Sequence, residues 1–172
     1  MLPPGHLAVS YILVKSAELA GFNVSFPETL VILAGSIILD FDIVFASFLK
    51  KSHHDLATHT PLGVFGIWLS FVLPFGSYFS TAAKVLILLC LLLHLVLDET
   101  GFWLCRLRLQ EISEEPQINW LYPLTKFPDG KTVYENHPFD FSWLDDYIRK
   151  AKANVFLEIV LSLIALLVFW LT

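Results

Sequence analysis

Three apolar stretches constrain this chain more than any other feature. Residues 61–79 contain no charged side chain, residues 81–97 contain one (Lys84), and residues 155–172 contain one (Glu158). A helix needs roughly 20 mostly apolar residues to cross a bilayer. The whole sequence is 56% hydrophobic and only 16% charged, whereas soluble domains average about 25% charged residues. We therefore predict an all-α integral membrane protein that forms a single membrane domain over residues 1–172.

Two further stretches are weaker candidates for membrane helices. Residues 28–49 are long and apolar but contain Asp40 and Asp42, and residues 6–22 are amphipathic. An amphipathic segment is either a span or a buried or interfacial helix. The aromatic and polar residues of 101–152 predict a cap that lies against the membrane interface. The expected bundle has a four-helix core and about five helices in total, over residues 6–22, 28–49, 61–79, 81–100 and 153–172.

Charge and cysteine content exclude several classes of partner. The net charge is −5 and no run of five Lys or Arg exists, so a nucleic-acid partner is not expected. The two cysteines are too few for a disulfide framework. Membrane lipid is the partner that this composition favours.

The ionisable residues of the apolar segments fall on one side of the expected bundle. In an up-down-up-down arrangement, the start of helix one, the end of helix two, the start of helix three and the end of helix four share one membrane face. Seven candidate metal ligands lie at these places: His6, Asp40, Asp42, His54, His59, His94 and Asp98. Basic residues of the same side predict, by the positive-inside rule, a cytoplasmic face of the cell (inner) membrane: Lys50, Lys51, Arg106, Arg108, Arg149, Lys150 and Lys152.

His94 and Asp98 are the clearest ligand pair. Residues four apart lie on the same face of a helix, and a neutral imidazole with a carboxylate suits zinc, iron or manganese. A plain hydrogen bond between the two side chains is the alternative. An Asp at the centre of a span costs roughly 2.5–3.5 kcal/mol, which favours a functional role.

Asp40 and Asp42 cannot both face one ion on a regular helix, because residues two apart point about 200° apart. Either one is a ligand and the other assists it or binds a second metal, or the helix loosens or ends near Leu39. A helix end that reaches polar solvent is the other interpretation.

The segment before the third helix adds His54 and His59 as candidate ligands. Thr58 and Thr60 could cap the following helix, which would begin at Pro61. A solvated loop with incidental histidines is the alternative.

Three or four N/O ligands with an open position are typical of a catalytic metal site. The seven candidates suffice for one or two divalent ions, expected to be zinc. A catalytic ion lowers the pKa of bound water toward 7 and polarises a phosphoryl oxygen. Asp40 and Asp55 are the candidates for a catalytic general base.

These motifs together resemble the YdjM-type family of membrane-bound metal-dependent hydrolases. The resemblance covers roughly residues 6–125. This chain departs from the family pattern at Leu39, which replaces a Pro, at Asp55-Leu56, which replace Arg-Gly, and at Thr60, which replaces a Ser. The matching residues are His6, the box Leu39 to Asp42, the box His54 to Thr60, the pair His94 and Asp98, and the motif Trp120 to Pro123.

The His-x-x-x-Asp order is in turn similar to that of zinc-dependent phospholipase C. That similarity implies a first metal on Asp42 or Asp40 with His59, His94 and Asp98, and a second on His6 and Asp98. It implies hydrolysis of a phosphoester at the membrane, such as a lipid head group. We place the candidate substrate contacts at Thr58, Thr60, Trp120 and Tyr122.

A function of another class fits the same residues. The polar cluster could be a hydrogen-bonded staple or a structural metal site in a non-catalytic membrane interaction or regulatory protein, since a structural ion stabilises a small bundle with the same ligands. A ligand shell with no open position would favour this alternative.

Overall fold

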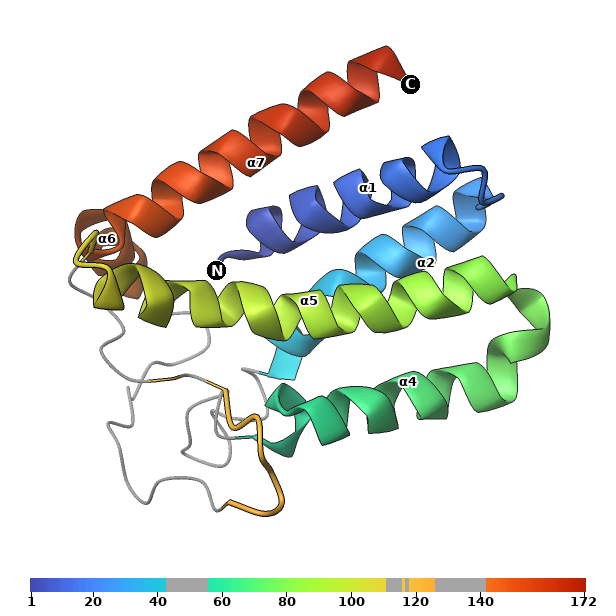
Figure 1. The fold of residues 1–172 in the computed structure, drawn as a ribbon, viewed down its shortest axis with the longest axis horizontal. Coiled ribbons are helices and arrows are strands. Elements are labelled where there is room, and N and C mark those ends of the chain that lie inside the picture. Colours follow the sequence, from blue (N-terminus) through green and yellow to red (C-terminus); the bar gives the residue numbers. More distant parts are fainter. Residues whose placement is uncertain (43–55, 111–115, 117, 126–141) are drawn as a thin grey trace.

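The computed structural model describes residues 1–42, 56–110, 116, 118–125 and 142–172. Within these ranges the chain is helical and contains no strand, which confirms the all-α prediction. The helices follow one another in Figure 1 as α1 (Pro3–Leu19), α2 (Phe26–Ile37), α4 (Pro61–Phe75), α5 (Thr81–Arg106), α6 (Ser142–Lys150) and α7 (Lys152–Leu171), and the short 3-10 helices are η1 (Ile38–Asp42), η3 (Ala57–His59) and η4 (Gly76–Tyr78).

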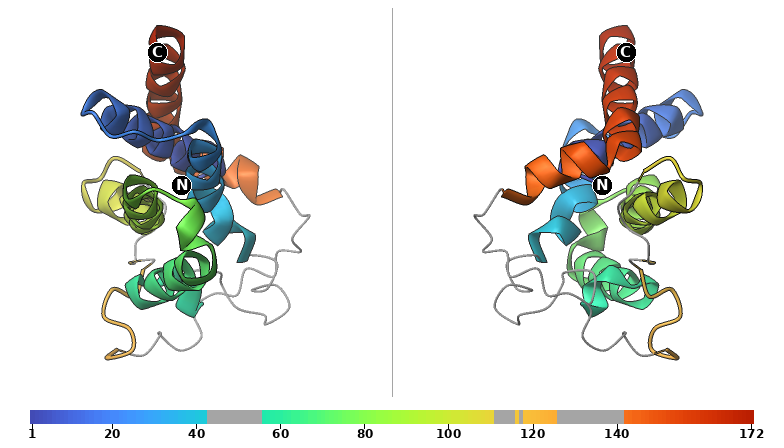
Figure 2. Two further views of the ribbon diagram at one scale, coloured as in Figure 1. Left: turned by 90° about the vertical axis from the view of Figure 1, so that its right-hand side faces the viewer. Right: turned by 90° about the vertical axis from the view of Figure 1, so that its left-hand side faces the viewer.

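The long helix α5 is the centre of the structure. It packs against α1, α2, α4 and α7, while α1 also packs against α2 and α7. Figure 2 shows α6 leaving the line of α7 at a sharp angle at their junction. Fully or almost fully buried apolar side chains hold these helices together, among them Val14, Ile32, Leu39, Val64, Leu91 and Leu95.

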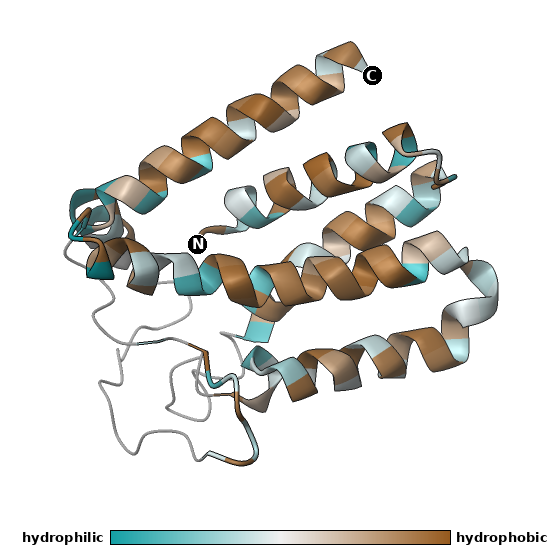
Figure 3. Cartoon of the chain, viewed as in Figure 1, coloured by the Kyte–Doolittle hydropathy of each residue, from teal (hydrophilic) through white to brown (hydrophobic). Residues whose placement is uncertain are grey.

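Among the described residues, three helical segments are long and apolar enough to cross a membrane: Pro61–Tyr78, Thr81–Arg106 and Lys152–Leu171. Figure 3 shows mainly hydrophobic residues along α4, α5 and α7. By contrast, α2 has 12 residues and is about 18 Å long at 1.5 Å per residue, which is short against a hydrocarbon core of about 30 Å. Three candidate spans support a membrane protein, whereas five membrane-spanning helices remain a prediction.

The single helix expected over residues 28–49 is not continuous. Its α-helical part, α2, ends at Ile37, and the chain continues as the 3-10 helix η1 to Asp42. Residues 43–49 lie outside the described ranges. Because η1 is a 3-10 helix, Asp40 and Asp42 do not have the angular spacing of a regular α-helix.

The helix expected over residues 81–100 is also longer than predicted. Gly101 does not break α5, which continues to Arg106, so the segment expected as a cap from residue 101 begins later. One glycine within a helix costs only about 1 kcal/mol, and the Gln110 side chain donates a hydrogen bond of 2.8 Å to the Gly101 carbonyl. His94 and Asp98 consequently lie within α5, not at its end.

The other boundaries shift by a few residues. The helix expected over 6–22 runs from Pro3 to Leu19 and stops before Gly21, whose φ of 93° favours glycine. The helix expected over 61–79 ends at Phe75 and turns through η4, and the one expected over 153–172 spans Lys152–Leu171.

Glu28 joins the start of α2 to the start of α5. It forms a capping box with Ser25, and its Oε1 accepts a hydrogen bond of 2.6 Å from the Ser80 backbone N–H. Burial alone would raise the pKa of Glu28, but the hydrogen bonds from Ser25 and Ser80 outweigh it and lower the pKa to about 2. The carboxylate form therefore stabilises this end of the bundle.

We expect Glu28→Ala to lower the free energy of unfolding by about 2–3 kcal/mol, since it removes a cap and a charge-assisted hydrogen bond. The stabilisation is fully present above the ordinary pKa of 4.5 and is lost as the pH falls through about 2. Thermal unfolding in detergent at several pH values measures this difference. The matched control is Glu18→Ala, which removes only an ion pair with Lys15 and should cost about 0.5 kcal/mol or less. Equal losses in the two variants would contradict the role given to Glu28.

Candidate metal centre

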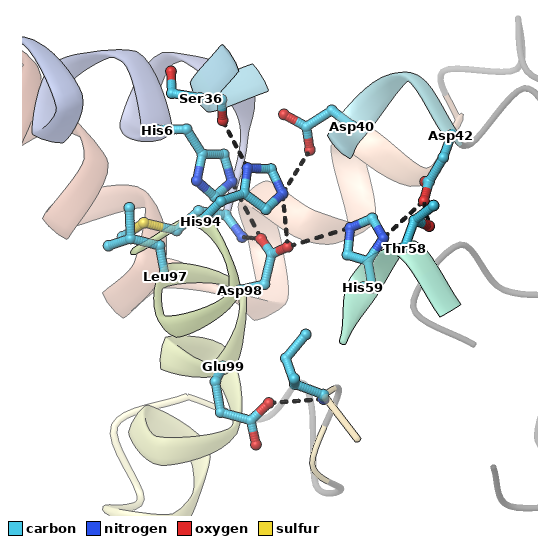
Figure 4. Close-up of polar contacts among 12 residues, drawn as sticks. His6, Ser36, Asp40, Asp42, Thr58, His59, His94, Leu97, Asp98 and Glu99 are labelled. Carbon is cyan, nitrogen blue, oxygen red and sulfur yellow. Dashed lines mark hydrogen bonds and ion pairs between the residues drawn. The ribbon is translucent and has the colours of Figure 1, made fainter. Parts of the chain in front are cut away.

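Four separate segments bring imidazole and carboxylate groups to one place in the bundle (Figure 4). The contributors are His6 from the first turns of α1, Asp40 and Asp42 from η1, His59 from η3, and His94 with Asp98 from α5. Six of the seven predicted ligands thus lie together. The seventh, His54, and the predicted base Asp55 lie outside the described residues. Apart from Asp40, each of the six is at most 8% exposed.

The carboxylate of Asp98 is at the centre of this cluster. Its Oδ2 lies 3.1 Å from His94 Nε2 and 3.8 Å from His59 Nε2. Its Oδ1 lies 3.2 Å from His6 Nε2 and 2.9 Å from the amino nitrogen of Met1. Three imidazole rings thus turn a nitrogen toward the two oxygens of one buried carboxylate.

Contacts on the far side of two rings determine which nitrogen carries the proton. His94 Nδ1 lies 2.8 Å from the Ser36 carbonyl oxygen, which can only accept, so Nδ1 is the donor. His59 Nδ1 lies 2.8 Å from Asp42 Oδ2, and an ionised Asp42 likewise only accepts. In the neutral rings Nε2 then presents a lone pair toward the oxygens of Asp98. Lone pairs that face each other repel, so this arrangement requires a proton or a metal cation between them.

His6 completes the group. Its ring stacks on that of His94 with a centroid distance of 3.9 Å and an interplanar angle of 15°. Neither ring nitrogen of His6 has a hydrogen-bond partner among the described residues, although the side chain is 0% exposed. Donor atoms of His6, His94 and Asp98 all lie within 4.8 Å of one another. Buried polar atoms are normally satisfied, so these residues fit a metal ion.

Asp40 and Asp42 take different positions. Asp42 accepts hydrogen bonds from the Thr58 hydroxyl and from His59, so it holds the His59 ring. Asp40 Oδ1 lies 3.7 Å from His94 Nε2, and its Oδ2 has no hydrogen-bond partner in the described part of the chain. Burial raises the pKa of the Asp40 carboxyl, while the nearby imidazoles of His94 and His6 act in the opposite direction. Asp40 is therefore the better placed of the two to contact an ion.

The position of His59 depends on a close approach between η3 and α4. Thr60 caps α4, as the sequence predicts: its hydroxyl donates to the Ala57 carbonyl (2.7 Å) and accepts from the Gly63 N–H (3.0 Å). A Cβ on Gly63 would lie 1.8 Å from the Ala57 carbonyl oxygen. Only glycine at this position lets η3, and with it His59, lie against the start of α4.

The predicted substrate contacts are less defined. Thr58 and Thr60 use their hydroxyls within the cluster and the α4 cap. Trp120 and Tyr122 lie in the 118–125 segment, which is joined to α5 by a hydrogen bond of 3.0 Å from the Ile118 N–H to Glu99 Oε2. A substrate-binding role for these four residues stays a prediction.

Two residues that shape the site, Ser36 and Gly63, carry no recognisable signal in the sequence. Ser36 acts through its main-chain carbonyl, which its side chain does not reveal. Gly63 acts by having no side chain, and a glycine two residues after Pro61 gives no specific signal. The pattern Thr-x-x-Gly at a helix start could have indicated the cap but not the close approach.

Comparison with known protein families, with curated proteins and with solved structures finds no match for this chain. The geometry of the cluster and the sequence motifs are therefore the observations that bear on function.

We expect Gly63→Ala to destabilise the protein by about 1–3 kcal/mol, as overpacking does, and to displace His59. Gly66→Ala is the matched control, because nothing lies within 4 Å of a Cβ at that position one turn later. Thermal unfolding in detergent and reactivity of His59 toward a histidine-modifying reagent measure the two effects. Similar behaviour of both variants would show that the close approach does not position His59.

Proposed function

We propose that this chain is a membrane-embedded metal-dependent hydrolase that cleaves a phosphoester, such as that of a lipid head group. The observation that carries the proposal is the orientation of His94 and His59. Their Nδ1 atoms are fixed by the Ser36 carbonyl and by Asp42, so their Nε2 atoms face the Asp98 carboxylate. A divalent cation at this place would be held by His94 and Asp98 together with His6, whose donor atoms lie within 4.8 Å of one another.

His6, His94 and Asp98 would hold the ion, with Asp40 or His59 as a further ligand. Nitrogen and oxygen donors of this kind suit zinc. Asp98 turns one oxygen toward His6 and the other toward His94 and His59, so it could also bridge two ions. A divalent ion at such a site supplies an acidified water and a Lewis acid for a phosphoryl oxygen.

The residues around the ion would each have a defined part in hydrolysis. Asp40 Oδ2 has no hydrogen-bond partner among the described residues and could accept a proton from the attacking water. Asp42 and the Ser36 carbonyl keep the rings of His59 and His94 in one orientation and tautomer. Asp55, the other base suggested by the sequence, remains a candidate outside the described ranges.

A substrate with an apolar part fits the surroundings of Asp40. The Asp40 side chain is 21% exposed, more than those of His6, His59, His94 and Asp98. Its neighbours on η1, Ile38 and Phe41, are 51% and 63% exposed. Apolar side chains beside the accessible edge of the cluster favour a membrane lipid as substrate, approaching from the cytoplasmic face that the basic residues indicate.

One observation favours the second candidate, a structural metal in a non-catalytic membrane protein. His6 and His59 are 0% exposed and His94 is 1% exposed, and a closed shell is typical of structural sites. A metal ion with a coordination position open to water or phosphate would favour hydrolysis over the structural role.

Metal content tests the proposal first. We expect purified wild-type protein to bind one or two Zn²⁺ ions, and His94→Ala and Asp98→Ala each to weaken binding at least about 100-fold, because each removes a direct ligand. Titration calorimetry and elemental analysis measure binding. The release of water-soluble phosphorus from phospholipid vesicles, as phosphorylated head group or as free phosphate, measures hydrolysis. Asp145→Asn, which changes an exposed carboxylate on α6, is the control and should leave both unchanged. A folded wild-type protein that binds no metal would refute the proposal, and a metal-loaded protein without hydrolysis would favour the structural alternative.

Asp42 offers a second test, because it would act through His59. Asp42→Asn retains an oxygen that accepts from His59 Nδ1, whereas Asp42→Leu removes it. Loss of such a partner lowers metal affinity about 10–100-fold. We therefore expect Asp42→Leu to bind Zn²⁺ about 10–100-fold more weakly than wild type, and the Zn²⁺ affinity of Asp42→Asn to be closer to that of wild type. Equal affinity in wild type and Asp42→Leu would mean that the orientation of His59 does not matter for binding.

A further inference from the structure

Glu158 is a second buried carboxylate in an apolar helix, and the proposed hydrolysis does not use it. It lies on α7, is 7% exposed, and interrupts an otherwise uncharged stretch of the span. Charged groups within a span are expensive and are kept where they have a partner and a role. The groups that contact the Glu158 side chain therefore indicate its role.

The partners of Glu158 come from two other parts of the chain. Its Oε1 accepts a hydrogen bond of 2.8 Å from the Leu2 backbone N–H and one of 2.7 Å from the Tyr147 hydroxyl. Burial, followed by the hydrogen bond to Glu158 and its charge, raises the pKa of Tyr147 above its ordinary value. The phenol therefore stays protonated and remains a donor.

The same side chain packs against the first turn of α1. A Cβ on Gly5 would lie 3.1 Å from Glu158 Cγ, so the backbone of α1 and the stem of Glu158 are in close contact. His6 is the next residue, and its ring stacks on His94 beside Asp98. Glu158 thus contacts α1 on both sides of the segment Pro3–Pro4 that opens the helix.

We propose that Glu158 is a positioning residue of the metal centre: it holds the first turn of α1 against α7, so that His6 meets His94 and Asp98. This inference rests on the proposed metal site, but it concerns residues that are not ligands. It assigns a role to α7, which otherwise contributes no residue to the cluster among those described.

Two substitutions separate hydrogen bonding from packing. Glu158→Gln keeps an Oε1 acceptor for Leu2 and Tyr147, whereas Glu158→Leu keeps similar bulk and loses the acceptor. We expect Glu158→Leu to weaken Zn²⁺ binding about 10–100-fold, as loss of an orienting contact does, and to change the visible spectrum of the Co²⁺-substituted protein. Glu158→Gln should restore affinity to within about threefold of wild type.

Glu18→Gln and Glu18→Leu are the matched controls on α1, since Glu18 pairs with Lys15 near the other end of that helix. They should leave the Zn²⁺ affinity and the Co²⁺ spectrum unchanged. Tyr147→Phe removes one of the two donors and should weaken binding by a smaller factor, which keeps the inference testable where Glu158→Leu does not fold.

The outcomes distinguish this inference from the proposed function. If wild type binds Zn²⁺ and neither Glu158→Leu nor Tyr147→Phe changes affinity or spectrum, the positioning role is wrong while the metal site stands. If wild type binds no metal, the proposed function fails, and modification of His6 by diethyl pyrocarbonate still decides the positioning. His6 should then be protected in wild type, Glu158→Gln and the Glu18 variants and become reactive in Glu158→Leu; protection in every variant overturns the inference.

Discussion

The negative charge of Asp98 is the constraint on which the rest of the structure depends. A carboxylate on a buried face of an apolar helix is stable only when cations or hydrogen-bond donors surround it. The chain supplies imidazoles from α1, η3 and α5, and an amino group, around this one side chain. The start of α1, the end of α2 and the start of α4 must therefore meet beside the second half of α5. The need to surround the Asp98 charge thus accounts both for the positions of these helices and for the residue types in the cluster.

Two of the imidazole rings are held by groups that contact them on the side away from Asp98. The Ser36 carbonyl holds His94, Asp42 holds His59, and the close contact at Gly63 fixes the segment that carries His59. Such outer contacts set the tautomer and the direction of a metal-binding histidine. They would also place the donor atoms before an ion binds, which would lower the entropy lost on binding.

The sequence could predict the convergence but not its details. The period and length of the apolar stretches, with polar residues at alternate ends, suffice to bring His6, His59, His94 and Asp98 to one side of a bundle. The sequence predicts unequal roles for Asp40 and Asp42 or a helix that loosens near Leu39, but not which aspartate faces the cluster, because that depends on the 3-10 helix that begins at Ile38. The sequence does not predict the extension of α5 past Gly101, because a single glycine is a weak helix breaker and the contact that stabilises the helix there comes from Gln110. Glu158 is recognisable in the sequence as the one charged residue of the apolar stretch 155–172. Only the fold shows that it contacts the start of α1.

Anomalous X-ray scattering from crystals of the detergent-purified protein, recorded on both sides of the zinc absorption edge, shows whether an ion occupies the cluster. We expect a peak between His6, His94 and Asp98, within bonding distance of their donor atoms and with at least one position open to water or phosphate. A well-ordered cluster of the same side chains with no anomalous peak, in protein purified without chelator and supplied with zinc, would contradict the proposed metal site. Protons alone would then bridge the imidazoles and Asp98.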